Sequence, residues 1–331
     1  MELPKHLRYE RCDWMIKTVP RAASSGQTRL GRFWKKCVRQ RWLLLMIVPG
    51  VLVLALFHYY PIYGLQIAFK NYNFGLGIWG SKWVGLKWFE TFLRNPFAPR
   101  LFRNTIFLGV FSLAWSFPLP IILSILINEL GGKRFKRSVQ TISYLPHFVS
   151  TVVVVGLLKE LCAADGIINR LLGMMGGKTI FFFSEPAWFR TLFVSSTLWQ
   201  ETGWNSIIFL AALTNVDQEM YEAAYIDGAN RWQRIRSITL PSILPTVTIL
   251  FILNVGKMLS MDYQKIMLMY SAQTYETADI IATYTYREGI ENMRYSYSAA
   301  VDLFMSVVSF LFLIAANKVV KLLSDDSNSL F

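Results

Sequence analysis

The chain has 331 residues, of which 53% are hydrophobic and 17% charged, and its formal net charge is +13. The apolar residues gather in long runs and the mean hydropathy is +0.35. This excludes an ordinary soluble globular protein, because a soluble chain of this size carries more charge and shorter apolar segments. The composition therefore predicts an all-α protein that crosses a membrane several times.

Residues 1–41 form a strongly basic segment in front of the first apolar run. Such an arm is typical of cytoplasmic segments that lie against anionic lipid. This interpretation is favoured over nucleic-acid binding, because a membrane segment follows directly. The leader is much longer than that of a cleaved signal peptide, so we expect the first apolar run to remain as a signal anchor.

Six apolar segments have about the twenty residues that are needed to cross a bilayer. We place these spans at residues 42–62, 104–128, 139–159, 188–213, 243–263 and 296–317. Pro118 and Pro120 predict a kink within the second span. The resulting organisation is a basic arm (1–41), a transmembrane domain (42–320) and a short cytoplasmic tail (321–331).

The orientation follows from the loop at residues 130–138, which carries four basic residues and no acidic one. Short loops with such an excess of Lys and Arg face the cytoplasm. With an even number of spans, both termini and the polar loop at 215–242 then lie in the cytoplasm as well. The aromatic-rich segments 63–103, 160–187 and 264–295 are expected outside.

The polar loop at 215–242 has the features of a helix-turn-helix. Asp217 can cap a first helix, because its side chain can accept hydrogen bonds from free N–H groups. Gly228 permits a sharp turn that a side chain would resist. Asp227 or Asn230 can start a second helix. We expect a rigid knob on the membrane surface, of the kind that can receive force from a separate protein.

The same loop carries a spaced pattern, which reads Glu222-Ala223-Ala224, Gly228, Ile238 and Leu240-Pro241. This pattern resembles the EAA signature of permease subunits in binding-protein-dependent ABC importers. Asn104-Thr105 resembles the entry of this permease core. Three further segments resemble the carbohydrate-uptake branch, and within it the polysaccharide–oligosaccharide permeases; they are Tyr144-Leu145-Pro146, Gly203-Trp204-Asn205 and Tyr275-Glu276-Thr277-Ala278-Asp279. The segment 261–264 departs from that branch, which often has Gly-Phe at this place.

The resemblance implies a MetI-like core of about six transmembrane helices, the permease fold of type I ABC importers. It also implies the partners, which are a second homologous permease, two copies of an ABC ATPase that hold ATP and Mg, and an extracytoplasmic solute-binding protein. The assembly would lie in the lipid of a bacterial cytoplasmic membrane. The residues expected to couple the permease to the ATPase are Glu222, Ala223, Ala224, Asp227, Gly228, Leu240 and Pro241.

We predict no catalytic or metal site in this chain. Residues 173–179 suggest a phosphate-binding loop, but Leu172 stands where such a loop has its first glycine. The cysteines and histidines lack metal-type spacing. Two alternative functions are a membrane-embedded glycosyl- or acyltransferase and a receptor that does not transport. Mutation of Glu222 or Gly228 separates them from a transporter, because only a transporter would lose ATPase coupling.

Charged residues within spans are costly in lipid and therefore informative. Glu201, Lys257 and Asp302 lie about 18 to 22 Å from the cytoplasmic ends of their spans, at about 1.5 Å per residue. One interpretation is an ion pair or triad that fixes helix packing, in which Lys257 neutralises Glu201 or Asp302. The other is a polar patch in the substrate path, in which Lys257 would favour an acidic sugar of the alginate or pectin type.

Aromatic and amide side chains complete the expected substrate path, because sugars stack on rings and hydrogen-bond through hydroxyls. The residues expected to line this path are Trp199, Glu201, Trp204, Asn205, Asn254, Lys257 and Asp302. Trp204 and Asn205 are the strongest candidates, since Gly203 beside them lets two helices approach closely. For each single aromatic residue, the alternative is helix packing or contact with lipid.

Overall fold

The computed structural model describes residues 39–323. The predicted basic arm therefore lies outside the described residues, apart from its last three positions, as does most of the predicted tail. The chain divides into two units, residues 1–63 and 64–331. In the first unit, α2 (Arg41–Leu54) buries no side chain and leads into a π-helical turn, η1 (Ala55–Tyr59). The helix continues through η2 (Tyr60–Phe69).

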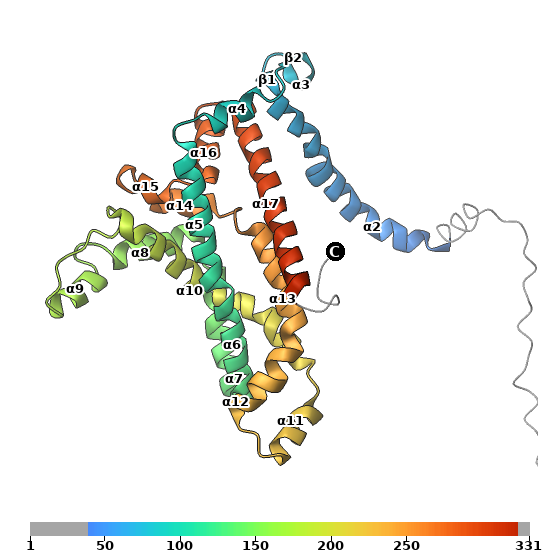
Figure 1. Cartoon of the computed structure of the whole chain (residues 1–331), viewed down its shortest axis with the longest axis vertical. Helices are drawn as coiled ribbons and strands as arrows, with labels where there is room; N and C mark the ends of the chain where they lie inside the picture. Colours follow the sequence, from blue (N-terminus) through green and yellow to red (C-terminus); the bar gives the residue numbers. More distant parts are fainter. Residues whose placement is uncertain (1–38, 324–331) are drawn as a thin grey trace, which may run out of the picture. The chain divides into compact units, whose positions relative to one another are not determined.

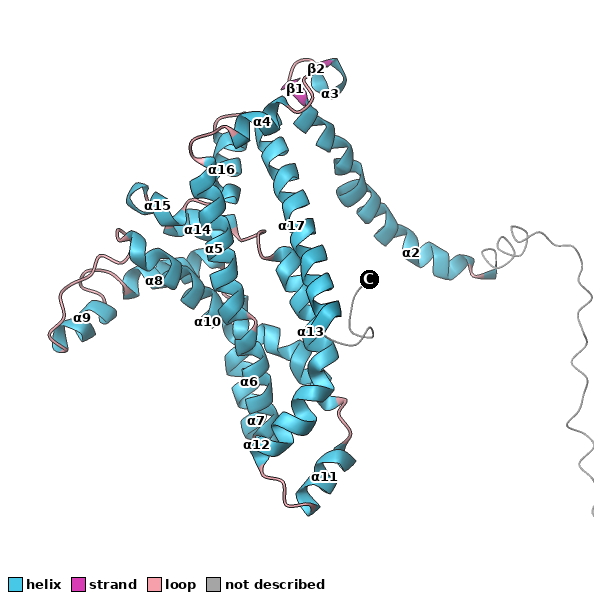
Figure 2. Cartoon of the chain, viewed as in Figure 1, coloured by secondary structure: helices cyan, strands magenta, loops and turns pink. Residues whose placement is uncertain are grey.

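Among the described residues of the second unit, the regular structure is helical apart from one small antiparallel hairpin (Figures 1 and 2). In this hairpin Lys70 pairs with Trp83. The elements up to the centre of the chain are β1 (Lys70–Asn73), α3 (Gly77–Gly80), β2 (Ser81–Trp83), α4 (Lys87–Leu93), α5 (Ala98–Ser116), α6 (Pro118–Glu129), α7 (Lys133–Tyr144), η3 (Leu145–Phe148), α8 (Thr151–Leu161), α9 (Ile167–Met174) and α10 (Pro186–Thr214). Those that follow are α11 (Gln218–Ile226), α12 (Arg231–Arg234), η4 (Ile235–Thr239), α13 (Leu240–Lys257), α14 (Tyr263–Met269), η5 (Ala272–Thr274), α15 (Tyr275–Ala278), α16 (Ile281–Tyr286), η6 (Arg287–Glu291) and α17 (Tyr295–Leu323).

Within the described residues, four helices are long and apolar enough to cross a membrane, namely Arg41–Phe69, Ala98–Glu129, Arg231–Lys257 and Tyr295–Leu322. The second of them is interrupted between α5 and α6 at Phe117, directly before Pro118. This is where the two prolines predicted a kink. Pro118 has no N–H to continue the ladder of α5.

The structure differs from the six predicted spans at two places. The third span is two helices, Lys133–Phe148 and Thr151–Leu161, which meet at an angle of 98° and make a fifth span only if they are counted together. The fourth, α10, has 29 residues but is not among the helices that are apolar enough. Its polar residues are tolerated because neighbouring helices, rather than lipid, surround much of it.

Helix α10 lies at the centre of the second unit and packs against α5, α6, α7 and α13. Its apolar side chains form two separate parts of the core. Phe189, Leu192 and Phe193 pack with Leu108 of α5 and with residues of α14 and α16. Toward the other end, Leu210 and Leu213 pack against residues of α6 and α13 in a second cluster. Because one helix joins both clusters, α10 fixes the spacing between the two ends of the unit.

The bend after α7 is held against α10 by direct contacts. Gly203 is buried at the crossing, and a Cβ built there would overlap the carbonyl group of Ser143 in α7. Three residues earlier, the Gln200 amide donates a hydrogen bond of 2.9 Å to the carbonyl of Val149, at the bend itself. The predicted close approach of two helices beside Gly203 is therefore present.

Candidate functional site

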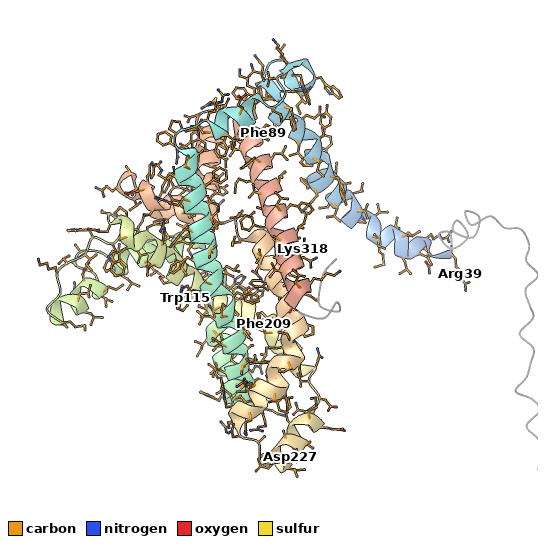
Figure 3. All side chains as sticks on the ribbon, viewed as in Figure 1. Arg39, Phe89, Trp115, Phe209, Asp227 and Lys318 are labelled. Carbon is orange, nitrogen blue, oxygen red and sulfur yellow. The ribbon has the colours of Figure 1, made fainter. Side chains whose placement is uncertain are left out.

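The predicted helix-turn-helix forms at one end of the second unit, and Figure 3 shows Asp227 at its tip. Asp217 caps α11 and accepts a hydrogen bond of 3.0 Å from the main-chain N–H of Glu219. Gly228 ends the helix with φ at +76°, a conformation that costs a side chain but not glycine. Main-chain bonds from Gly228 to Tyr225 and from Ala229 to Ala224 close the turn in the usual manner of a glycine C-cap.

Of the two residues expected to start the second helix, Asp227 and Asn230, it is Asn230 that caps it. Its side chain and that of Gln233 each accept a hydrogen bond from the other residue's main-chain N–H. From Arg231 the helix continues without a break to Lys257. The turn and the span are therefore one helix, so a displacement of the turn moves the span.

The coupling hairpin, residues 217–234, presents large apolar side chains to the outside. Tyr225, Ile226 and Trp232 are 73%, 83% and 69% exposed. Ala223 is exposed beside them and Ala224 is half-buried. Exposed apolar patches rimmed by polar residues mark protein interaction sites. This arrangement suits a partner that packs on the hairpin.

The remaining predicted coupling residues lie around this apolar surface. Glu222 and Asp227 are exposed on the hairpin, while Leu240 and Pro241 occupy the first turn of α13. The two groups are joined by one side-chain hydrogen bond, because the Tyr221 hydroxyl lies 2.9 Å from Thr239 Oγ1. Thr239 is only 1% exposed. This hydrogen bond connects the hairpin to the start of the span.

The basic loop and the coupling hairpin lie at the same end of the unit (Figure 1). Ile127 of α6, Val139 of α7 and Ile235 of η4 belong to one apolar cluster there. The orientation predicted from the basic residues of 130–138 requires this proximity, because both segments were assigned to the cytoplasmic side.

The charged triad expected within the spans does not form. Glu201 pairs with His147 instead, at 3.1 Å between Oε2 and Nδ1. Lys257 is exposed at the last position of α13, and within residues 39–323 it has no ion pair. The expectation that Lys257 neutralises Glu201 or Asp302 is wrong, because α13 ends at Lys257 and the chain turns away there.

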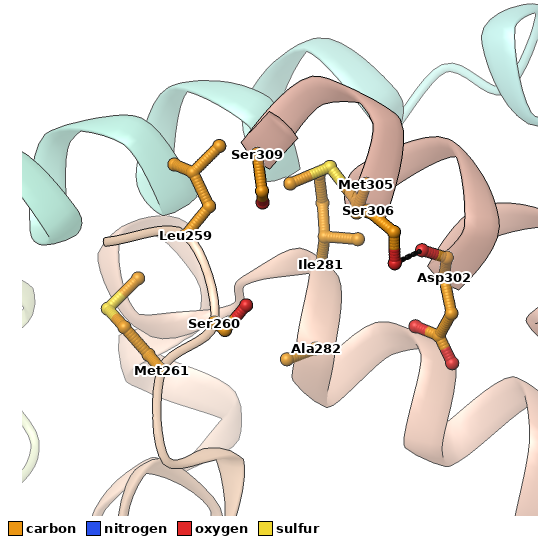
Figure 4. Close-up of a pocket in the computed structure, with 9 residues that line it drawn as sticks. All are labelled: Leu259, Ser260, Met261, Ile281, Ala282, Asp302, Met305, Ser306 and Ser309. Carbon is orange, nitrogen blue, oxygen red and sulfur yellow. Dashed lines mark hydrogen bonds between the residues drawn. The ribbon is translucent and has the colours of Figure 1, made fainter. Parts of the chain in front are cut away.

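Asp302 lies on α17 and lines a cavity of about 280 Å³ (Figure 4). Ser260 and Ser306 share that lining, and the Ser306 hydroxyl donates 2.9 Å to the main-chain carbonyl of Asp302. Neither Glu201 nor Lys257 borders it. Asp302 therefore lies in a cavity that no residue of α10 lines.

The cation near Glu201 is Lys265 of α14, which the sequence interpretation missed. Its side chain is 4% exposed, and Nζ donates to Thr197 Oγ1 at 3.1 Å and to Gln200 Oε1 at 3.3 Å. Burial lowers the pKa of Lys265 to about 8, against the opposing effect of the nearby carboxylates of Asp262 and Glu201. The sequence predicts that residues 264–295 lie outside the membrane, so Lys265 is not among the expected path residues. The departure from the family pattern at 261–264, directly before it, is the signal that could have pointed to this segment.

Lys265 borders a polar cavity of about 320 Å³. Helices α5, α8 and α10 and the segment before α14 enclose it, and Gln200, Glu201 and Asp262 are among its lining residues. The sequence placed one of these, Glu201, in the substrate path. The cavity has both charges and an aromatic ring, Phe193. It can therefore bind a polar molecule through hydrogen bonds and apolar contact.

The other predicted path residues fall into three situations. The Trp204 indole stacks on His147, with ring centroids 4.4 Å apart and planes at 5°. Asn205 and Asn254 meet across a second, smaller cavity of about 60 Å³ beside the interruption between α5 and α6. Trp199 is 53% exposed and borders neither cavity. Asn205 and Asn254 therefore line one cavity together, whereas Trp199 lines neither of the two cavities.

Two of the family-like segments meet at the end opposite the coupling hairpin. Asn104 donates hydrogen bonds of 2.8 and 3.0 Å to the carbonyls of Glu276 and Asp279. Thr105 Oγ1 accepts one from the main-chain N–H of Ile281. The Asp279 carboxylate is 1% exposed and is held by Arg287 at 2.9 Å. These motifs fasten the segment 275–287 to α5, so their role here is structural.

The two lysines give a direct test of the revised site. Replacing Lys265 with Met leaves Thr197 Oγ1 and Gln200 Oε1 without their donor, so we expect a loss of about 2 kcal/mol in the free energy of unfolding. Lys257→Met removes an exposed charge at a helix C-terminus, worth about 1 kcal/mol or less. Thermal unfolding of the purified variants measures both. An equal loss in the two would contradict the assignment.

Comparison with known proteins shows which family has this architecture. Residues 97–325 match the model of a family described as the binding-protein-dependent transport system inner membrane component. Protein LplB of Bacillus subtilis (strain 168) is 42% identical over 92% of this chain and 98% of its own length. The polygalacturonan/rhamnogalacturonan transport system permease protein YteP of the same organism is 42% identical over 86% of this chain and 89% of its own length.

A solved structure is similar over most of the chain. It is that of a bacterial alginate ABC transporter in complex with a periplasmic protein bound to alginate pentasaccharide. One of its chains matches with a TM-score of 0.80 at 38% identity, over 89% of this chain and 99% of that chain.

Proposed function

This chain belongs to the family of binding-protein-dependent transport system inner membrane components, and from that premise we propose that it is the permease subunit of an ATP-driven oligosaccharide importer. It forms part of a path across the cytoplasmic membrane and opens that path alternately to either side. The energy comes from a separate ATPase. The chain itself acts mechanically and carries no catalytic residue.

The observation that carries this proposal is the coupling hairpin. It is capped at both ends of its first helix, is tied by Tyr221 to Thr239 and continues without interruption into a span. Its exposed Tyr225, Ile226 and Trp232 suit a docked ATPase. A movement of the hairpin is transmitted along the helix Arg231–Lys257, because main-chain hydrogen bonds resist compression of a helix.

The partners of the proposed assembly follow from the family. We infer a second homologous permease, two copies of an ABC ATPase that bind ATP and Mg, and an extracytoplasmic solute-binding protein. The similar alginate transporter, which was solved with a periplasmic protein, supports the last of these. The basic segment 130–138 lies at the end that carries the coupling hairpin, which supports a cytoplasmic position for both, and for the two termini.

The substrate class rests on the relatives rather than on Lys257. YteP is named for polygalacturonan and rhamnogalacturonan transport, and the similar structure is an alginate transporter. We therefore propose oligosaccharides, with acidic chains of the pectin or alginate type among them. The polar cavity beside Lys265 and the stacked Trp204 offer the hydrogen bonds and ring surface that sugars require.

The proposed function is tested in liposomes that contain the chain together with its partner permease and ATPase. The binding protein, loaded with the oligosaccharide, is added on the side that the extracytoplasmic face of the transporter occupies. We expect ATP-dependent uptake of trigalacturonate or an alginate trisaccharide, and no ATP hydrolysis by the purified chain alone. Omission of the ATPase is the control. Hydrolysis by the isolated chain, or uptake without the ATPase, would overturn the proposal.

A further inference from the structure

The cavity beside Lys265 is bordered by four residues of α10, and it lies away from the coupling hairpin. Its volume is about 320 Å³, at the lower end of the range for small-molecule pockets, with room for about one or two sugar units. Ser112 of α5, Thr151 of α8 and Phe193 of α10 border it together with the charged residues. Three helices and the α13–α14 connection therefore determine its shape.

Several polar atoms of this lining are available to a ligand. Glu201 uses Oε2 for His147, and Asp262 uses Oδ1 for two main-chain N–H groups at the start of α14. Across the described part of the chain, the second oxygen of each carboxylate has no hydrogen-bond partner, and neither do the hydroxyls of Ser112 and Thr151. All four groups can bond to an incoming molecule.

The charge balance of the lining decides which molecule fits. Lys265 is the single cation in the lining, and two carboxylates, Glu201 and Asp262, face it. Lys265 donates to two neutral groups, Thr197 and Gln200, rather than to an acid. A ligand carboxylate would bring a third negative charge into this space, which like charges oppose. Hydroxyl groups instead donate to carboxylates in charge-assisted hydrogen bonds, which are about twice as strong as neutral ones.

We propose that this cavity is a subsite for one sugar unit, bound through its hydroxyls by Glu201, Asp262, Ser112 and Thr151, and that it excludes the carboxylate of a uronate. Lys265 lies beside the two carboxylates and keeps the lining in place through its hydrogen bonds to Thr197 and Gln200. The Phe193 ring contacts the apolar face of the sugar. The proposal rests on the proposed function and makes it more specific, since the carboxylates of an acidic chain must then lie outside this cavity.

Two trisaccharides that differ only at C6 test the subsite, namely galactotriose and trigalacturonate. Their binding is measured by equilibrium dialysis with the complete transporter in nanodiscs, without the binding protein. We expect wild type to bind galactotriose about tenfold more tightly than trigalacturonate, a difference of about 1.4 kcal/mol. In the double variant Glu201→Gln with Asp262→Asn, which keeps both shapes and removes both charges, the two affinities should come within about threefold.

The matched control is the double variant Glu160→Gln with Asp165→Asn, which removes one Glu and one Asp that are exposed outside the cavity. It should keep the wild-type preference. If the first double variant fails to fold, Ser112→Ala removes one unpartnered hydroxyl and should weaken galactotriose binding about threefold, with Ser138→Ala as its control.

An unchanged preference in the cavity variants, or no binding of either sugar, would overturn the subsite alone. The proposed function fails separately, if the liposome assay shows no uptake.

Discussion

Replacing Gly203 with Ala should prevent the chain from folding into its native packing. A Cβ at this position would overlap the carbonyl carbon and oxygen of Ser143. These are backbone atoms of α7, so they cannot move aside as a flexible side chain would. Overpacking of this kind costs about 3 kcal/mol or more. The measurement is the yield and unfolding temperature of the monodisperse protein in detergent.

The matched control is Gly156→Ala, in the middle of α8. A Cβ at Gly156 meets no atom within 4 Å, so only the helix propensity changes. Alanine there is expected to stabilise the helix by about 0.5 to 1 kcal/mol. If Gly203→Ala were as well tolerated as Gly156→Ala, the close crossing of α7 and α10 would be wrong. The bend at Val149 would then lose one of its two supports from α10.

Replacing Ile226 with Asp should abolish uptake while the chain stays folded. Ile226 is 83% exposed, so the permease itself loses little when the side chain changes. An ATPase docked on the coupling hairpin would have to bury the new carboxylate against its apolar surface. A central interface position of this kind is worth about 2 to 4 kcal/mol, which corresponds to a loss of affinity of about 30-fold to 1000-fold.

Uptake in liposomes and ATPase co-purification measure this effect together. Met174→Asp is the matched control, because Met174 is 84% exposed on α9, away from the hairpin. It should keep both uptake and bound ATPase. Full activity of the Ile226 variant, or an equal loss in the Met174 variant, would show that the hairpin is not the docking site. Glu222→Gln and Gly228→Val extend the test to the residues of the signature.

The features that the sequence predicted well are those set by short-range interactions. The caps of Asp217 and Asn230 bond to main-chain groups two and three residues away. The turn at Gly228 depends on its own φ. The interruption before Pro118 follows from a missing N–H in the same segment. Neighbours in the chain determine each of these, so the residue types and their spacing were sufficient.

The bent third span shows where that reasoning stopped. Its apolar residues, 139–159, count as a continuous run, and hydropathy does not distinguish a straight helix from two helices at 98°. The bend is held by Gln200, more than fifty residues away, which satisfies the free carbonyl of Val149. Pro146 and the N-cap Ser150 mark a break in the helix at this place, but the contact with α10 is needed to hold the two helices at this angle.

What the sequence by itself determined is the membrane character of this protein, its coupling hairpin and the likeness to a transporter family, because composition and local backbone chemistry suffice for all three. Only the tertiary structure decided which charges share a site. Counting residues along separate helices placed Glu201, Lys257 and Asp302 at one depth, but depth leaves the direction of each helix face undetermined. Packing around α10 brought Lys265 to Glu201 and left Lys257 exposed, because burial of a charge depends on the partners that the fold supplies.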